Sequence, residues 1–388
     1  MTNIIPGAVI IEGHIQGLSN TRSLGEIGIP VYVVDKNDCI ARYSKYCNKF
    51  FICPEYNDDR FVDFLIDLVH KEEINNWVLI PSNDYAVLSI SKNKNQLEKC
   101  FRILTPSYDI LENIYNKAKL LKIALLKDIP FPSTHYFLNE SDILPDNFSF
   151  PVITKGKFGL EFYKTFKKKA FLAESENQLK AHLINIAARY PVSDTFTQEV
   201  IPSCGQNKTI SFAAFCSKGE ILSFWMGEKL REHPVKFGTA TFSQSIYNED
   251  ILKTSIVLLK ELKYTGPCEI EFLKDPRDDK YKLIEINART WLWVGLAKAC
   301  GIDFAKMIYC FANDIPFAYP SNYKTNIKWR NSFTDIVYTF IAIIKGVTSL
   351  RTVIYQNKGL IIDAIALKGD NKPFWAYLYL SISYLFRR

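Results

Sequence analysis

Several features that would define a function class at once are scarce in this chain or missing from it. Among its 388 residues there are 9 cysteines, an odd number, and they show neither CxxC nor zinc-type spacing. This argues against a disulfide framework or a structural zinc site and indicates a reducing compartment. Cys39, Cys47 and Cys53 lie fairly close together, but no histidine accompanies them, so we expect no metal site there.

Long apolar runs and a strong charge of one sign are also lacking. No run of about 20 apolar residues occurs, which argues against a spanning helix, and the first residues lead us to expect no secretory signal. The net charge of +7 is mild and the lysines are spread out, so nucleic-acid binding is not expected. With 48% hydrophobic residues, the composition is that of a globular protein large enough for two or three domains. We expect a cytoplasmic protein.

The first hundred residues alternate between short apolar strands and helical segments. Strands are predicted at 7–11, 31–34 and 77–80, with an amphipathic helix at 61–70. This rhythm predicts a parallel α/β unit whose ligand edge lies at the strand ends. The glycines do not form GxGxxG, so no dinucleotide site is inferred. Asp84 follows a strand, where such folds bind ligands, but a turn or helix-cap role is an equal alternative.

The middle of the chain, from about 106 to 320, has the pattern of an α+β unit. A helical stretch is predicted at 108–127, and basic residues follow a strand at 227–233. The glycine- and lysine-bearing segment 156–160 could lie over phosphates, or could form a surface turn. The other predicted elements are strands at 150–155, 196–202, 209–216 and 221–226 and helices at 251–262 and 303–311.

Residues 269–289 form the most informative segment. Two alternating runs flank a turn at 275–279, which predicts a β-hairpin. Ile284 and Ile286 should share its apolar face. Glu271, Glu285 and Asn287 should be neighbours on the other face, with Glu269 and Arg289. Two carboxylates and an amide oxygen suit Mg²⁺.

The alternative interpretation is a half-buried hairpin with a solvated charged face, which is the commoner case for such a short pattern. No lysine balances the acidic side chains on that face, and Trp291 and Trp293 follow at once. Aromatic residues beside charge are unusual at the end of a plain exposed strand. The pattern therefore favours phosphate chemistry.

The last 70 residues or so change character. Apolar and aromatic segments at 336–344 and 374–386 are too short to cross a bilayer, and the chain ends in Arg387-Arg388. The second segment could lie on a membrane surface. We expect it instead to pack against the main body or at a homodimer interface.

Taken together, these motifs resemble the ATP-grasp superfamily, and most of all its carboxylate–amine ligases, the group that includes D-aspartate ligase-like enzymes. The similarity extends over about residues 5–320. It implies a Rossmann-like α/β domain at 1–105, an ATP-grasp domain of two subdomains at 106–320, and a mostly helical extension at 321–388. The overall fold class is α/β and α+β.

The resemblance also implies roles for particular residues. Glu271, Glu285 and Asn287 would hold Mg²⁺, with Mn²⁺ as an alternative. The residues implied to bind ATP are Lys117, Lys155, Gln198, Glu199, Val200 and Ile201. Those implied to stabilise the transferred phosphoryl group and the acyl-phosphate are Lys229, Arg231 and Arg289. The N-terminal domain would shape a substrate pocket with Ser19, Asn20, Arg22 and Asp84.

The implied reaction is ATP-dependent ligation of a small carboxylate to an amine, such as that of an amino acid, through an acyl-phosphate, with release of ADP and phosphate. Two alternatives stay open. One is an ATP-grasp enzyme with a different acceptor. The other is a non-catalytic nucleotide-binding scaffold whose C-terminal tail docks a partner or the inner face of a membrane.

Overall fold

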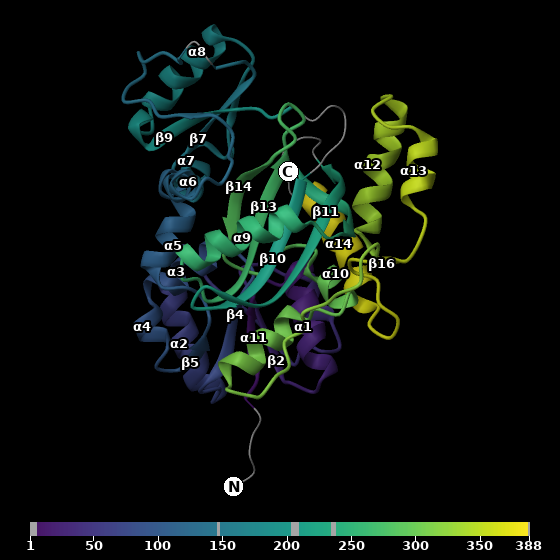
Figure 1. Cartoon of the computed structure of the whole chain (residues 1–388). Helices are drawn as coiled ribbons and strands as arrows, with labels where there is room; N and C mark the ends of the chain where they lie inside the picture. The colour runs from purple at the N-terminus through teal and green to yellow at the C-terminus, as the bar shows by residue number, and fades with distance from the viewer. Residues whose placement is uncertain (1–5, 146–147, 203–208, 234–237, 387–388) are drawn as a thin grey trace.

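Three β-sheets organise the chain in the computed structural model, which describes residues 6–145, 148–202, 209–233 and 238–386. Figure 1 shows the N-terminal elements at the bottom, a small sheet with its helices at the upper left, and the largest sheet between them. The predicted α/β and α+β fold class is confirmed. The domain boundaries at 105 and 320 stay a prediction.

The N-terminal sheet is entirely parallel, in the order β3-β2-β1-β4-β5. Each residue of its central strand, β1, is buried, as expected for a strand covered on both faces. Ala8 and Ile10 pack with α1, whereas Val9 and Ile11 pack with α2. The elements of this part are β1 (Ala8–Ile11), α1 (Ile15–Glu26), β2 (Val31–Asp35), a 3-10 turn (Ile40–Tyr43), β3 (Lys49–Ile52), α2 (Arg60–Glu72), β4 (Trp77–Pro81), α3 (Asp84–Lys92), α4 (Lys94–Leu97) and β5 (Phe101–Ile103).

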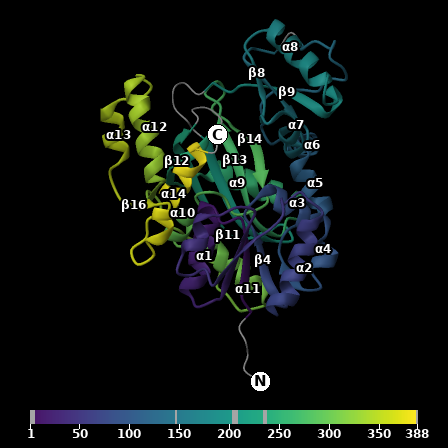
Figure 2. The same ribbon diagram turned by 180° about the vertical axis from the view of Figure 1, so that it is seen from behind.

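Two helices connect this sheet to the small one, as the view from behind also shows (Figure 2). The single helical stretch predicted at 108–127 is in fact α5 (Tyr108–Tyr115) followed by α6 (Lys117–Leu126). Asn116 divides them because its backbone is extended and its side-chain oxygen accepts hydrogen bonds from the N–H groups of Ala118 and Lys119. An asparagine that caps a helix in this way begins a new helix.

The small sheet has the order β6-β9-β7-β8. Phe162 and Phe166 of α7 and Leu179 and Leu183 of α8 pack with it in a separate hydrophobic core. Its elements are β6 (Thr134–His135), β7 (Val152–Gly156), α7 (Gly159–Phe166), β8 (Phe171–Ala173), α8 (Glu176–Ala187), a 3-10 turn (Val192–Asp194) and β9 (Thr195–Glu199).

The largest sheet has the order β14-β13-β10-β11-β12-β15-β16. Residues 227–233, predicted to follow a strand, are part of the long strand β11, which pairs with β12 over most of that segment. The elements are β10 (Thr209–Ser217), β11 (Glu220–His233), β12 (Thr239–Ser245), α9 (Glu249–Glu261), β13 (Gly266–Lys274), β14 (Tyr281–Asn287), α10 (Val294–Ala299), α11 (Phe304–Ala312), β15 (Lys328–Arg330) and β16 (Ile361–Asp363).

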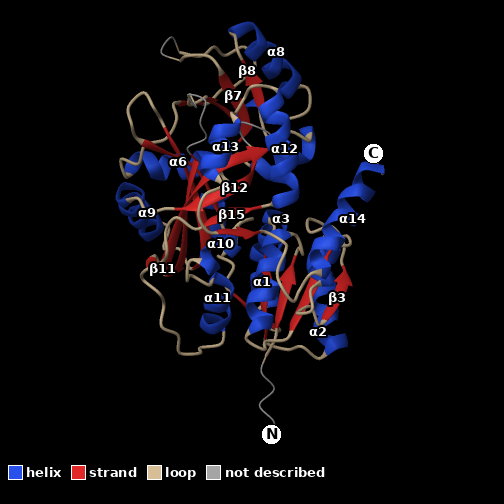
Figure 3. Cartoon of the chain, turned by 90° about the vertical axis from the view of Figure 1, so that its right-hand side faces the viewer, coloured by secondary structure: helices blue, strands red, loops and turns tan. Residues whose placement is uncertain are grey.

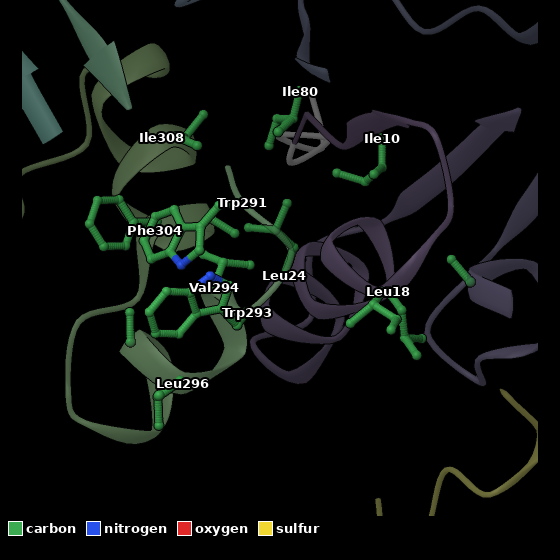
Figure 4. Packing of buried hydrophobic residues seen from close by; sticks show 14 of the residues in the cluster. Ile10, Leu18, Leu24, Ile80, Trp291, Trp293, Val294, Leu296, Phe304 and Ile308 are labelled. Carbon is green, nitrogen blue, oxygen red and sulfur yellow. The ribbon is translucent and has the colours of Figure 1, made fainter. Parts of the chain in front are cut away.

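A buried cluster of tryptophans joins the largest sheet to the N-terminal part. Trp225 of β11 stacks on Trp291, with ring centroids 5.7 Å apart, and meets Trp293 edge-on at 5.2 Å. Figure 4 shows Trp291 and Trp293 beside Leu24, in a core that also holds Leu18 of α1. Trp291 and Trp293 are therefore core residues, and they anchor the end of the hairpin that lies opposite its turn.

The C-terminal segment is built into the body as well. It contains α12 (Ser332–Ile344), α13 (Leu350–Gln356) and α14 (Lys372–Phe386), while β15 and β16 extend the largest sheet. Figure 3 shows α12 and α13 facing the viewer and α14 beside the N-terminal part. Phe374 and Tyr377 of α14 pack against the main core, which confirms the expected packing. Arg387 and Arg388 lie outside the described residues, and no helix that is described is long and apolar enough to cross a membrane.

Candidate active site

The predicted hairpin exists as β13 and β14, and its register brings the acidic residues together. Glu269 lies opposite Asn287, and Glu271 lies opposite Glu285. One detail of the prediction is wrong: Ile284 does not share the apolar face with Ile286. The register shifts next to Glu271 and Phe272, so that Leu283 pairs with Phe272 and is fully buried in the core. Ile284 is the extra residue of a β-bulge.

Lysines from two other elements reach this acidic row. Nζ of Lys229, on β11, lies 3.1 and 3.2 Å from the carboxylate oxygens of Glu271. Nζ of Lys117, at the first turn of α6, lies 3.3 Å from Oε2 of Glu285. Burial of the Lys229 ammonium opposes its charge, but Glu271 and Glu269 outweigh burial and raise its pKa. Lys229 is therefore cationic at neutral pH, and both lysines are directed at the hairpin.

Glu285 is the carboxylate most strongly influenced by these cations. Lys117 is the main cause that lowers the pKa of Glu285 to about 2, with Lys169 and Lys155 acting in the same direction. The side chain of Glu285 is still 40% exposed, so a ligand can reach it. Burial lowers the pKa of Lys155 to about 8, although Glu285 partly opposes this shift. Lys169 was not predicted, and no local sequence pattern distinguishes it from the neighbouring lysines 167 and 168.

Glu269 is a further member of the row that was not among the predicted site residues. It is only 3% exposed, and Nδ2 of Asn287 donates a hydrogen bond of 3.1 Å to its Oε2. Burial, and then the nearby Glu271, raise the pKa of Glu269 to about 7. Its position two residues before Glu271 on the same strand face was the signal that could have identified it.

Arg289 is bound by the N-terminal part of the chain. Its guanidinium donates to both carboxylate oxygens of Asp84 at 2.9 and 2.8 Å, and the hydroxyl of Tyr115 donates to the same carboxylate at 3.0 Å. Asp84 begins α3, so the strand-end position noted in the sequence does lie next to the hairpin. The Asp84 carboxylate raises the pKa of Arg289 despite burial.

Glu12 lies in the same region and was also missed. It follows β1 with φ of +71°, and its carboxylate accepts hydrogen bonds from Gln16 at 2.8 Å and Asn83 at 2.9 Å. Burial raises the pKa of Glu12 to about 7, and Asp84 and Arg289 are among the charges that influence it. A left-handed conformation at a non-glycine residue after a strand cannot be read from the sequence.

Four of the residues implied to bind ATP, 198–201, lie at the end of β9 in the small sheet. Oε2 of Glu199 accepts from Arg277 at 2.7 Å, and Oε1 accepts from the Ser133 N–H at 2.8 Å. Arg277 belongs to the turn between β13 and β14, so this ion pair connects the small sheet to the acidic hairpin. Gln198 donates to Thr134 at 3.0 Å. The Val200 N–H donates to the Pro151 carbonyl at 3.1 Å, and Ile201 is buried.

The basic segment 156–160 is short and lies against the start of α6. The carbonyl of Lys157 accepts a hydrogen bond of 2.8 Å from the Lys117 N–H, and Phe158 forms a β-bridge with Asn116. The Tyr85 hydroxyl donates to the carbonyl of Leu160 at 3.0 Å. The segment therefore holds the backbone of Lys117 and connects to the N-terminal part.

Arg231 is directed away from the acidic row. The pairing of β11 with β12 shifts between Lys229 and Arg231, so the expected alternation of side chains is broken there. The Arg231 guanidinium instead binds Asp335 of α12, at 2.8 and 2.6 Å, and Gln356 of α13, at 2.6 Å.

Of the three other predicted substrate residues, two have partners inside the protein. Arg22 donates to Asp370 at 2.8 Å and is buried with it, so it connects α1 to the C-terminal segment. Asn20 donates to Thr290 at 2.9 Å, next to Arg289. Ser19 is partly exposed and faces Gly295 of α10.

The donor set of the hairpin fits a hard divalent cation. In the described part of the chain, no group of three or more His, Cys, Asp or Glu residues forms a metal site on its own. Glu271, Glu285 and Asn287 supply two carboxylates and an amide. Mg²⁺ commonly takes one or two protein carboxylates and completes its shell with phosphate oxygens and water.

Comparisons with known proteins agree with this geometry. Residues 227–318 match the family model for the ATP-binding domain of the carbamoyl-phosphate synthase L chain. D-aspartate ligase of Enterococcus faecium is 27% identical over 283 residues, 69% of this chain and 67% of that protein.

Two solved structures share the fold. The L-amino acid ligase of Bacillus licheniformis has a TM-score of 0.60 at 15% identity, over 80% of this chain and 74% of that one. The biotin carboxylase domain of Hydrogenobacter thermophilus 2-oxoglutarate carboxylase, solved with MgADP, ADP and bicarbonate, has a TM-score of 0.64 at 15% identity, over 83% and 73%.

The three sheets and the acidic hairpin define an ATP-grasp protein. Within that superfamily, the chain is a homologue of D-aspartate ligase.

Proposed function

We propose that the protein is an ATP-dependent ligase that joins a small carboxylate to an amine. The observation that carries this proposal is the row of Glu269, Glu271, Glu285 and Asn287 on two paired strands, approached by lysines of α6, β7 and β11. A solvated structural hairpin does not need converging cations from three separate elements. An ATP site does, because the triphosphate and its metal bring both signs of charge.

In this proposal the nucleotide and the metal bind where Lys117 now contacts Glu285 and Lys229 contacts Glu271. Lys117 and Lys229 would contact phosphate oxygens in place of part of their present carboxylate contacts, and Lys155 would contact phosphate oxygens beside them. Residues 198–201, where β9 ends, would adjoin the adenine. The Glu199–Arg277 pair would hold that end of the small sheet against the hairpin.

Glu271, Glu285 and Asn287 would hold Mg²⁺, or Mn²⁺ in its place, and the ion would neutralise charge on the phosphates. Glu269 holds Asn287 in place by accepting the hydrogen bond from the Asn287 amide. This hydrogen bond fixes the Asn287 side chain, whose amide oxygen would be the metal ligand. The support matches the behaviour of outer residues that position metal ligands.

The chemistry starts with the substrate carboxylate, which attacks the γ-phosphate of ATP and displaces ADP. The resulting acyl-phosphate has a good leaving group, which a free carboxylate lacks. The amine then attacks the carbonyl carbon and phosphate departs, leaving an amide. Phosphoryl transfer needs little covalent help from a protein, so positioning and charge neutralisation are the main contributions.

Arg289 is proposed to stabilise the acyl-phosphate and the oxyanion formed when the amine attacks it. Asp84 and Tyr115 already fix the orientation of its guanidinium. We do not assign a catalytic role to Arg231 or a substrate role to Arg22, because each is bound by a carboxylate of the C-terminal segment. The proposed substrate pocket therefore retains Asp84, with Asn20 and Ser19 nearby.

The test is ADP release from mixtures of carboxylic acids and amino acids, with and without Mg²⁺. Release should require Mg²⁺ and both substrates, and E285Q should slow it about a hundredfold or more because a metal ligand is lost. The matched control is E261Q, since Glu261 of α9 forms a surface pair with Lys127, which follows α6. Unchanged turnover by E285Q would contradict the proposal.

The fold also supports a second candidate, in which the activated carboxylate meets a different acceptor. The carboxylase domain with the same fold is the observation that favours it. ADP release that depends on a carboxylate but gives no amide by mass spectrometry would select this candidate. Nucleotide binding without any turnover would select the non-catalytic scaffold instead.

A further inference from the structure

Helix α12 buries polar side chains and exposes apolar ones. Its buried residues are Asp335 and Thr339, both polar, and Asp335 is held by Arg231 and Thr241 of the largest sheet. Its large apolar residues are on the outside, at spacings of three and four residues that form one stripe. These exposed residues are Phe333, Ile336, Val337, Phe340, Ile341 and Ile344.

Helix α13 and the loops around it continue this arrangement. No residue of α13 is buried. Its C-terminal end is attached through polar contacts: Arg231 binds the Gln356 side chain, Lys328 donates to two backbone carbonyls, and Arg330 donates to Asn357. The exposed apolar residues here are Val347, Leu350, Ile354, Tyr355 and Leu360.

The two helices and their loops, residues 333–360, therefore form a hairpin that polar contacts fix to the body and that presents exposed apolar side chains on both helices. We call this the α12–α13 surface. Exposed apolar surfaces of this extent on a folded protein mark interaction sites. In Figures 1 and 3 both helices stand at the outside of the molecule, on the side of the largest sheet.

The charge on this surface has one sign. Lys345, Arg351 and Lys358 are exposed on it, and residues 336–362 contain no Asp or Glu. The two acidic residues that flank this range are occupied: Asp335 by Arg231, and Asp363 by the Ser332 hydroxyl and the Ile365 N–H. An apolar face bordered by cations alone matches an anionic lipid surface.

We propose that the α12–α13 surface docks the protein on the surface of an anionic lipid bilayer, with the apolar stripe entering the headgroup–acyl boundary. A second copy of the chain is the less favoured occupant, because pairing two such hairpins would bring their like charges together. The inference is independent of the proposed reaction. Arg231 links the docked hairpin to β11, the strand that carries Lys229.

The test is co-sedimentation of the full chain with vesicles. Binding should be strong for vesicles of phosphatidylglycerol and phosphatidylcholine in equal parts, weak for phosphatidylcholine alone, and reduced by salt. The double variant F340S/I344S should lower the bound fraction about tenfold or more, because both side chains lie in the stripe. The control I256S/V257S replaces two exposed apolar residues on α9, which are 44% and 43% exposed.

A second variant keeps the test decisive if the first one folds poorly. K345E/R351E should abolish the preference for anionic vesicles while leaving thermal stability unchanged, since both side chains are exposed. Equal binding of these variants and the wild type, or no binding by any of them, would overturn the proposal. It would also be overturned by a dimer in light scattering without lipid that F340S/I344S converts to monomer.

Discussion

Arg289 and Asp84, 205 residues apart in the chain, form a two-point ion pair in which Nε and Nη2 each contact one carboxylate oxygen. The arginine follows the last strand of the acidic hairpin, and the aspartate begins α3 of the N-terminal part. The pair therefore joins the proposed reaction centre to the proposed substrate pocket. Arg289 is already charged, oriented and largely buried before any ligand arrives.

Breaking this pair should destabilise the fold more than an ordinary surface ion pair does. D84N leaves the Arg289 cation without its main partner, and we expect it to lower the free energy of unfolding by about 2 kcal/mol. Breaking a largely buried ion pair lowers the free energy of unfolding more than breaking an exposed one. The 28% exposure of Asp84 reduces the effect here. The double variant D84N/R289Q should recover part of the loss, as urea unfolding would measure.

The exposed pair of Lys180 and Glu176 on α8 provides the comparison cycle. Its coupling energy should be below about 0.5 kcal/mol. If the cycle for Asp84 and Arg289 gave an equally small value, the two residues would not be a fixed unit of the site, and the orienting role of Asp84 would be wrong.

Lys155 should make nucleotide binding depend on pH. Its pKa is lowered to about 8 in the free protein, mainly by burial. A bound polyphosphate favours the charged ammonium and raises that pKa. Binding should therefore take up a proton above pH 8, and the dissociation constant of ATP should rise by up to about tenfold per pH unit between pH 8 and 9.5. Calorimetry in buffers of different ionisation enthalpy measures this uptake.

The variant K155R separates this effect from other titrations, because arginine stays charged over the whole range. Glu269, with a pKa near 7, is already ionised above pH 8 and does not interfere. K155R should bind ATP with little pH dependence from 8 to 9.5. A wild-type protein without proton uptake in that range would show that Lys155 does not contact the nucleotide.

Gly227 should be intolerant of a side chain. It lies in β11 beside the indoles of Trp225 and Trp293, and a Cβ atom there would come within 2.5 Å of Trp293 and closer still to Trp225. Both rings are buried, so G227A should lower the free energy of unfolding by about 1–3 kcal/mol through overpacking.

The control is G159A at the start of α7, where a Cβ atom would meet nothing within 4 Å. This replacement should be neutral or slightly stabilising, because alanine favours helix more than glycine does. Chemical denaturation of the two variants would measure the difference. An equal effect of both would show that the indole cluster can adapt.

The hairpin was predictable because strand alternation and a strong turn signal act over a few residues. The β-bulge at Ile284 was not, since it depends on whether Leu283 or Ile284 fills the core of the largest sheet. The same limit explains Arg231. Its role was implied by the resemblance, and the shift in the pairing of β11 with β12 turns its side chain away from the acidic row.

Contacts between residues that are distant in the sequence were also not predictable. Nothing near Asp84 in the sequence indicates that Arg289 will bind it, and nothing near Glu12 indicates its left-handed backbone. Lys117 and Lys155 were identified only through resemblance to a known family, and the structure places both beside Glu285. Whether they bind ATP stays a prediction.

The contact between Arg22 and Asp370 has a consequence for synthesis of the protein. Asp370 also accepts hydrogen bonds from Ser44 and from the backbone of Lys45, so the first α/β unit has three groups that the end of the chain must satisfy. During translation, that unit emerges from the ribosome before Asp370, so the Arg22 guanidinium stays in water at first. The unit reaches its final form only after residue 370 has been made.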